Sequence, residues 1–354
     1  MSQRTKVYLY GDELHLSPAE IAAELARLTA EQSPEADTYG LGGLVEEVED
    51  FFARQLGKER ALFMPTGTLA NHLAIRKLAG ERRRVIVQEV SHIYNDTGDS
   101  SQTLSNLTLL PLASGQATFT WQQVEEALRR TESGRVAAPV GAISIESPVR
   151  RLAGELFDHG EMTGICERAR KQGMRVHLDG ARLYIASAYT GISPADYAKP
   201  FDTVYVSLWK YFNSMNGAIL AGPKEVLDGM FHTRRMFGGA LFNAWPFALL
   251  ARHYASGYLD HMKSAIAVSE AFIEGINAKG LRVERVPNGS NVFRLTVAGD
   301  KAETLRSRLT DQAVMLPRPG RADGGSVFWL QVNETWNRTT GEKLVEQFSS
   351  ALRG

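Results

Sequence analysis

Residues 175–210 read RVHLDGARLYIASAYTGISPADYAKPFDTVYVSLWK, and this stretch decides how the chain is organised. It begins and ends with short runs of β-branched and aromatic residues, which are typical of buried strands, and the sequence between them suits a helix. The first run ends on Asp179, and the second leads through Ser207 to Lys210. Because the carboxyl ends of parallel strands share one edge of a sheet, where ligands bind, we expect these residues to form one site.

An acid and a lysine at one edge of a parallel sheet suit a site for pyridoxal phosphate. The lysine amine forms a Schiff base with the cofactor, and the acid keeps the pyridine nitrogen protonated so that the ring accepts electrons. Taken alone, an aspartate and a lysine at strand ends are more often a surface ion pair. Gly180 and Arg182, which follow Asp179 in HLDGAR, favour the site, since glycine allows a tight exit from the strand.

HLDGAR followed by a strand that leads to a lysine resembles the threonine aldolase and β-eliminating lyase family of pyridoxal-phosphate enzymes. The resemblance covers residues 37–245 and includes DTYGLGGLVEEVE at 37–49 and RRMFGGALFNA at 234–244. It implies the α/β fold-type-I architecture, with a mainly parallel sheet in a large domain and a small α+β domain. We expect an N-terminal arm and helix at 1–36, the cofactor domain at 37–250 and the small domain at 251–354.

The segment Thr66-Gly67-Thr68 follows an apolar strand and opens a helix. Hydroxyl groups and free amides at a helix start donate to an anion, and the helix dipole favours negative charge there. By itself the segment is more often an ordinary helix cap. Together with Asp179 and Lys210 it predicts the site of the cofactor phosphate.

The resemblance implies roles for further residues around the cofactor. His92 corresponds to a histidine that stacks on the pyridine ring, and it joins Lys210 and Asp179 as a catalytic candidate. Arg182 corresponds to an arginine that contacts the cofactor or the substrate carboxylate. Ser207 is also expected to bind the cofactor. The alternative for each residue is a purely structural role: His92 as an imidazole whose hydrogen bonds are satisfied within the protein or by water, and Arg182 as an arginine that only stabilises the fold.

Substrate contacts are harder to place. Tyr39 corresponds to a residue that walls the pocket, often from the neighbouring subunit, and Gly11 stands where the family has a substrate-contacting serine. Phe328 and Trp329, at 328–329, stand where the family has an arginine for the substrate carboxylate. Arg318 and Arg321 on the preceding loop are therefore the candidates, although loop arginines are more often only solvated.

Two departures from the family pattern bear on the reaction. Residues 147–151 read SPVRR and lack the family's second histidine near the substrate β-hydroxyl, so His92, a water or another group would have to serve. Large side chains, Trp209, Tyr211, Phe212 and Phe242, replace smaller or charged ones and favour a substrate side chain larger than a methyl group.

We expect a lyase that cleaves the Cα–Cβ bond of a β-hydroxy-α-amino acid to glycine and an aldehyde, as threonine aldolases do. One alternative is β-elimination or other chemistry at Cα of an amino acid. Another is a pyridoxal-phosphate-binding protein without turnover. Family members are homotetramers built from dimers with shared active sites, so we expect a homodimer or homotetramer.

Composition narrows the class of protein. The 354 residues include 40 basic and 40 acidic side chains, a balance that indicates neither a nucleic-acid nor a membrane partner. The single cysteine, Cys166, excludes an internal disulfide and favours a reducing cytoplasm. We see no run apolar enough to span a bilayer, no signal peptide and no Cys/His spacing typical of a metal site.

Overall fold

The computed structural model describes residues 2–322 and 325–353, and its strands form sheets of seven, four and two strands. The seven-stranded sheet has the order β2-β8-β7-β6-β5-β3-β4. Its strands are β2 (Arg60–Met64), β3 (Arg84–Gln88), β4 (Thr108–Leu112), β5 (Val140–Glu146), β6 (Arg175–Asp179), β7 (Thr203–Ser207) and β8 (Ala218–Gly222). β8 runs antiparallel to both of its neighbours and the remaining pairs are parallel, which confirms the mainly parallel sheet.

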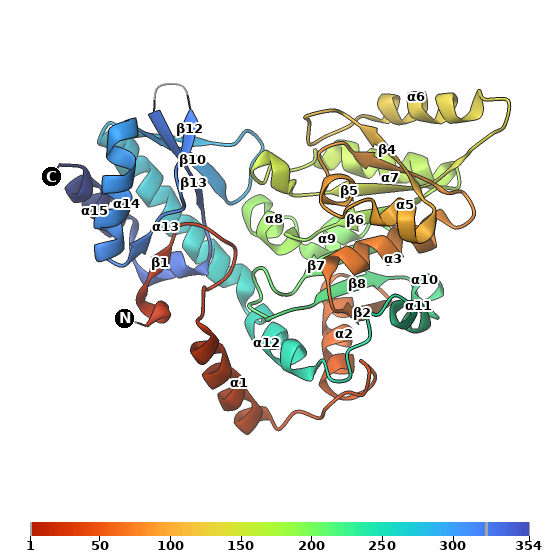
Figure 1. The fold of residues 1–354 in the computed structure, drawn as a ribbon, viewed down its shortest axis with the longest axis horizontal. Coiled ribbons are helices and arrows are strands. Elements are labelled where there is room, and N and C mark those ends of the chain that lie inside the picture. The colour runs from red at the N-terminus through yellow and green to blue at the C-terminus, as the bar shows by residue number, and fades with distance from the viewer. Residues whose placement is uncertain (1, 323–324, 354) are drawn as a thin grey trace.

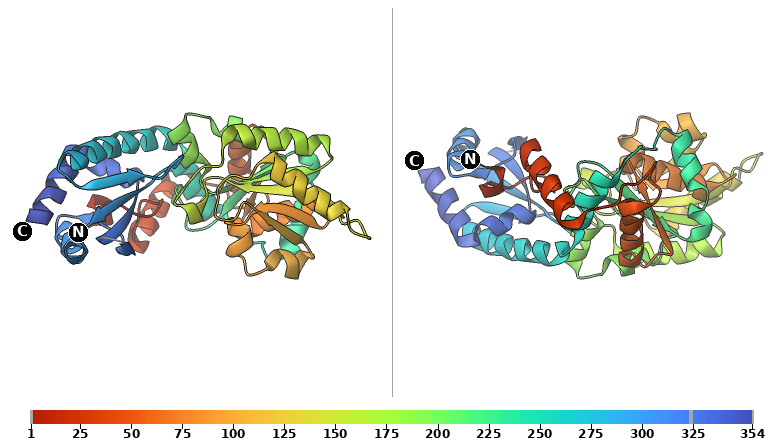
Figure 2. Two further views of the ribbon diagram at one scale, coloured as in Figure 1. Left: turned by 90° about the horizontal axis from the view of Figure 1, so that it is seen from above. Right: turned by 90° about the horizontal axis from the view of Figure 1, so that it is seen from below.

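Helices cover both faces of this sheet, and together they make the large lobe of the molecule (Figure 1; Figure 2). α3 packs on one face, and α2 and α7 to α9 pack on the other. The helices of the large lobe are α2 (Gly43–Gln55), α3 (Gly67–Ala79), α4 (His92–Asn95), α5 (Ser100–Ser105), α6 (Trp121–Glu132), η2 (Arg150–Leu152), α7 (His159–Lys171), α8 (Leu183–Thr190), α9 (Pro194–Ala198), α10 (Lys224–Leu227), α11 (Met230–Met236) and α12 (Trp245–Ala255).

The two faces of β6 and β7 differ in chemistry. Side chains alternate along a strand, so Val176 and Leu178 enter the apolar core on the α7 side while His177 and Asp179 face α3. β7 follows the same rule, with Val204 among the side chains on the α7 side. Polar side chains of two central strands are therefore buried between the sheet and α3, at a place where core residues are normally apolar.

The small lobe contains the four-stranded antiparallel sheet, in the order β12-β13-β10-β9. Its elements are α13 (Tyr258–Ala278), β9 (Arg282–Arg285), β10 (Val292–Val297), η3 (Gly299–Lys301), α14 (Ala302–Asp311), β11 (Val314–Met315), β12 (Gly320–Ala322), β13 (Gly325–Gln331), η4 (Glu334–Arg338) and α15 (Gly341–Arg353). One face of the sheet, with Phe293, Leu295 and Phe328, is buried in the core that also includes residues of α13 to α15. The other face carries Arg294 and Trp329, which pair in register.

The start of the chain lies on the small lobe (Figure 1). After η1 (Gln3–Thr5), β1 (Val7–Tyr8) pairs in parallel with β11, and α1 (Pro18–Gln32) follows, packing against α12. The expected N-terminal arm therefore lies against the C-terminal part of the chain, while the domain boundaries themselves stay a prediction. None of the helices in the described ranges is long and apolar enough to cross a membrane.

Candidate active site

Neighbouring parallel strands bring most of the predicted residues to one edge of the large sheet. α4 begins at His92 just after β3, and β5 and β6 end on Glu146 and Asp179. Lys210 follows the end of β7, which pairs with β6 so that Asp179 lies opposite Tyr205. The strand order therefore places the acid and the lysine at the same edge, as predicted from the sequence.

Asp179 is held firmly at its position. One carboxylate oxygen, Oδ2, lies 2.5 Å from Asn71 Nδ2, and the other, Oδ1, accepts a hydrogen bond of 3.1 Å from the backbone amide of Ala181. The side chain is almost fully buried, as is Asn71 on α3. Asn71 was not among the predicted site residues, although its place one helical turn after Gly67 predicts that it faces the sheet.

Lys210 has the properties of a reactive amine. Burial lowers the pKa of Lys210 to about 8, and the charge of Arg182 acts in the same direction, while Asp179, Asp12 and Glu146 oppose the shift. These four charges therefore surround the amine, whose Nζ lies 4.4 Å from the centre of the Trp209 ring. A lysine with this pKa is partly uncharged near neutral pH, and an uncharged amine is the form that attacks a carbonyl carbon.

Glu146 is a second buried acid beside Asp179. Burial and the charge of Asp179 both raise the pKa of Glu146 above its ordinary value. Its Oε2 accepts a hydrogen bond of 2.5 Å from the amide of His92, and its Oε1 accepts one of 2.9 Å from the amide of Arg150. The imidazole of His92 is partly exposed and lies 3.4 Å from Asp96 Oδ2. Glu146 therefore fixes the loop that presents His92.

Arg182 is paired with a residue from the start of the chain. Its Nε donates a 2.8 Å hydrogen bond to Asp12 Oδ2, and both side chains are largely buried. Asp12 Oδ1 also accepts from Asn291 and Gln331, at 3.3 and 3.4 Å. Gly11 lies in the same place, because its amide donates to Gln331 Oε1 at 2.8 Å. The structure thus brings Gly11 and Arg182 together, and no sequence pattern predicted that Asp12 pairs with Arg182.

The start of α3 has clear structural roles. Thr66 Oγ1 accepts a 3.2 Å hydrogen bond from the Leu69 amide, so it caps the helix. A Cβ atom on Gly67 would lie 1.9 Å from the hydroxyl of Tyr205, so only glycine fits there. The Ser207 hydroxyl is buried and makes no hydrogen bond within the described part of the chain. Such an orphaned donor suits a ligand oxygen, and the phosphate role of Thr66, Gly67, Thr68 and Ser207 stays a prediction.

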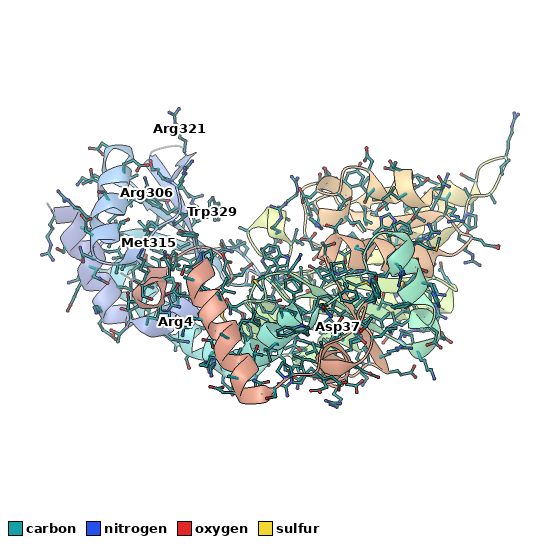
Figure 3. All side chains as sticks on the ribbon, turned by 60° about the horizontal axis from the view of Figure 1, so that its bottom comes forward. Arg4, Asp37, Arg306, Met315, Arg321 and Trp329 are labelled. Carbon is teal, nitrogen blue, oxygen red and sulfur yellow. The ribbon has the colours of Figure 1, made fainter. Side chains whose placement is uncertain are left out.

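Tyr39, Arg318 and Arg321 are the other predicted substrate residues. Tyr39 packs edge-on against Phe242, with ring centres 5.3 Å apart, and the Arg235 guanidinium lies 4.3 Å from the Tyr39 ring centre. Arg318 and Arg321 are exposed, and Arg321 points away from the small lobe (Figure 3). The roles of Tyr39, Arg318 and Arg321 toward the substrate stay predictions.

A cavity of about 820 Å³ lies between the two lobes. Its lining includes Arg150, Arg151 and Glu155 from the large lobe and Glu284, Arg294, Trp329 and Gln331 from the small lobe. The amide of Arg150 binds Glu146, and Gln331 contacts Asp12, so two lining residues touch residues of the site. Lys210, Asp179 and His92 are not part of the lining. Arg294 stands beside Trp329, which replaces the expected arginine. The guanidinium Nη2 of Arg294 pairs with Glu284 Oε2 at 3.2 Å, whereas its Nε is buried with no partner among the described residues.

The chain matches the family model described as beta-eliminating lyase over residues 17–298. The chain belongs to the beta-eliminating lyase family. This membership confirms the resemblance carried by HLDGAR, and with it the fold-type-I architecture and pyridoxal phosphate as cofactor. The residues present fit that cofactor, since this edge offers a half-buried amine, a buried carboxylate and a buried hydroxyl without a partner among the described residues. Within the described residues no cluster of metal-ligating side chains occurs.

Among similar proteins, a low-specificity L-threonine aldolase of Candida albicans is 28% identical over 244 residues, or 67% of this chain and 63% of that protein. This chain thus spans less than two thirds of that relative's length. A solved structure from Listeria monocytogenes, assigned as an L-allo-threonine aldolase, is 28% identical with a TM-score of 0.81 and covers 99% of this chain and 96% of its own. An alanine racemase of Cochliobolus carbonum is 28% identical over 187 residues, 52% of this chain and 47% of its own length.

Proposed function

We propose that this chain is a pyridoxal-phosphate-dependent aldehyde-lyase that cleaves the Cα–Cβ bond of a β-hydroxy-α-amino acid to glycine and an aldehyde. The observation that carries the proposal is the placement of Asp179 at the end of β6 and of Lys210 just after the end of the adjacent parallel strand β7, with the pKa of Lys210 lowered to about 8. The likeness to threonine aldolases over most of the chain supports the reaction type.

Each residue of the edge then has a task. Lys210 would hold the cofactor through its amine. Asp179 would keep the ring nitrogen protonated, and His92 would contact the ring. When bound, pyridoxal phosphate supplies an electron sink for the pair of electrons left by bond cleavage. Thr66, Gly67, Thr68 and Ser207 hold the phosphate.

Removal of the β-hydroxyl proton needs a base, and the chain lacks the family's second histidine. We assign the task to His92, whose imidazole faces Asp96 at 3.4 Å and belongs to the same edge. A His92→Asn variant with normal turnover would show that another group or a water is the base.

The cavity between the lobes is the proposed space for the substrate. Arg294 offers a guanidinium for the carboxylate in place of the arginine that Trp329 replaces, and the Trp329 ring suits a side chain larger than a methyl group. The test is a panel of L-threonine, L-allo-threonine and phenylserine, followed by detection of released aldehyde and glycine. We expect phenylserine to be cleaved most efficiently, and absence of turnover on every member would reject the aldolase.

A second candidate is β-elimination or another reaction at Cα. The missing histidine and the likeness to an alanine racemase favour it, because such reactions need no proton removed from a β-hydroxyl. Pyruvate and ammonia formed from serine, or loss of optical rotation in L-alanine, would establish this alternative. A cofactor spectrum that shifts with amino acids while no product forms would instead indicate binding without turnover.

We further propose that the protein acts in the cytoplasm as a homodimer or homotetramer with shared active sites. Leu41, Met236 and Phe242 are more than half exposed in the single chain and belong to the segments around Tyr39, as a subunit contact requires. Mixing an inactive Lys210→Ala protein with an inactive Tyr39→Ala protein should restore part of the activity in mixed oligomers. A monomer in analytical ultracentrifugation would reject the shared site.

A further inference from the structure

Behind Asp179, three polar residues form a chain of hydrogen bonds that runs away from the candidate active site. Asn71 Nδ2 lies 2.5 Å from Asp179 Oδ2, His177 Nε2 lies 2.9 Å from Asn71 Oδ1, and Thr203 Oγ1 lies 2.8 Å from His177 Nδ1. Asn71, His177 and Thr203 have no exposed surface. They occupy the layer between α3 and the sheet, where the surrounding side chains are apolar.

The Asp179 carboxylate sets the direction in which every hydrogen bond of this series is donated. An ionised carboxylate only accepts hydrogen bonds, so Asn71 turns its amide nitrogen toward Asp179 and its carbonyl oxygen toward His177. The imidazole must therefore carry its hydrogen on Nε2, and its bare Nδ1 accepts the hydroxyl hydrogen of Thr203. Thr203 thereby fixes the orientation of His177, and His177 fixes that of Asn71. Asn71 in turn holds Oδ2 of Asp179 in place.

The hydrogen bonds of Asn71, His177 and Thr203 orient Asp179 without bringing another charge into the core. Burial lowers the pKa of His177 to about 3, so the imidazole is neutral at any pH at which the protein works. Asn71 and Thr203 are uncharged, so Asp179 is the single charged member. Polar groups buried in this way are costly when only partly satisfied and rigid when every partner is present. A fully paired chain is therefore a means of holding one carboxylate in one orientation.

We propose that Asn71, His177 and Thr203 are positioning residues that aim the Asp179 carboxylate at the ring nitrogen of pyridoxal phosphate. The inference rests on the proposed role of Asp179. With Oδ2 held by Asn71 and Oδ1 by the Ala181 amide, the carboxylate cannot rotate without breaking a buried hydrogen bond. A preorganised partner stabilises the protonated ring better than one that must first reorient.

The test measures cofactor binding rather than turnover. Asn71→Ala removes the donor to Asp179, and Asn71→Asp replaces it with a second carboxylate of the same size. Thr203→Val removes only the hydroxyl, and Thr203→Ser retains it. We expect both Asn71 variants to raise the Kd for pyridoxal phosphate by roughly 10- to 100-fold and to change the visible spectrum of the bound cofactor. Thr203→Val should raise Kd by about threefold, and Thr203→Ser should restore it.

A matched control lies where α3 contacts α5. His72 Nε2 lies 2.6 Å from Ser105 Oγ, and both side chains are buried, so Ser105→Ala breaks a similar pair away from Asp179. We expect this variant to lower the melting temperature and to leave Kd and spectrum unchanged. If the Asn71 variants fail to fold, the comparison of Thr203→Val with Thr203→Ser still tests the proposal.

Two results would overturn the inference. One is a folded Asn71 variant with the Kd and spectrum of the unmodified protein. The other is an equal rise in Kd for Thr203→Val, Thr203→Ser and Ser105→Ala, which would mean that general loss of stability explains the effect. Failure of the aldolase proposal is separate, because it would appear as a wild-type protein that binds the cofactor and cleaves no substrate.

Discussion

The two edges of the seven-stranded sheet carry lysines with similarly perturbed pKa values and different surroundings. At the amino edge, burial lowers the pKa of Lys58 to about 8, and its ammonium donates to the carbonyl oxygen of Phe201 at 2.6 Å. Nearby, Asp202 accepts from Arg175 at 2.8 Å and from the Val176 amide at 2.7 Å. The polar groups at this edge satisfy one another.

The carboxyl edge is organised differently. Burial also lowers the pKa of Lys210 to about 8, but its amine lies over the Trp209 ring, close to Asp179 and Arg182. The hydroxyl of Ser207 there has no partner among the described residues, and a residue that lines the cavity touches this edge. A lowered lysine pKa alone therefore does not mark a site. What distinguishes a candidate site is a lysine with a lowered pKa that lies beside polar groups without partners in the protein.

Replacing the two lysines should give the sharpest contrast. Lys210→Ala should reduce turnover by roughly 10³-fold or more, because the residue bonded to the cofactor is lost. Borohydride reduction should then no longer attach the cofactor, as intact mass would show. Lys58→Ala should keep activity within about twofold while lowering the melting temperature. Cofactor attachment that survives in Lys210→Ala would identify another lysine.

The two acids provide the next contrast. Asp179→Asn keeps the shape and removes the charge that holds the ring nitrogen protonated, so we expect turnover to fall by roughly 10²-fold. Asp202→Asn should instead cost about 1–3 kcal/mol of stability, because its buried hydrogen bonds are weakened. Chemical denaturation and steady-state kinetics separate the two effects. Equal loss of turnover in both variants would remove the distinction between the edges.

The pH dependence of cofactor capture follows from the lowered pKa of Lys210. Only the uncharged amine attacks the cofactor aldehyde, so capture by cofactor-free protein should accelerate as pH rises through about 8. Between pH 7 and pH 9 the uncharged fraction grows by about tenfold. Stopped-flow absorbance measures the rate, and Lys58→Arg should leave the midpoint unchanged. A midpoint near the ordinary lysine pKa would mean that burial does not act on Lys210.

The pair between Asp12 and Arg182 predicts an effect on substrate affinity. Asp12→Asn removes the charge that holds Arg182, and we expect KM to rise by about tenfold with a smaller change in kcat. The measurement is steady-state kinetics on the best substrate of the panel. A fall in kcat with KM unchanged would place Arg182 on the cofactor instead.

The smallest effect is expected in the cavity. Arg294→Gln should raise KM several-fold, by roughly the value of one charge-assisted hydrogen bond. Arg318→Gln, on an exposed side chain, should leave KM unchanged. If Arg318→Gln raised KM and Arg294→Gln did not, the carboxylate would bind at the loop predicted from sequence.

Sequence patterns predicted the large sheet and the edge that carries the site, because strand ends and glycine turns are local signals. Asp179 and Lys210 lie at that edge for this reason. The pairing of Asp12 with Arg182 joins residues far apart in the chain, and no local pattern encodes it. The same holds for Arg294 beside Trp329, which depends on strand register. Gly67 is explained by Tyr205, a contact that only the packed structure reveals.

The bond between the Gly11 amide and Gln331 Oε1, together with the pairing of β1 and β11, has a consequence for biosynthesis. Asp12 reaches Arg182 from a segment that is anchored on β11 and β13, which are translated after β8. A ribosome-bound chain that has emerged only as far as β8 already holds Asp179 and Lys210, yet it lacks the anchor that steadies Arg182. The site is therefore complete only after β13 has emerged.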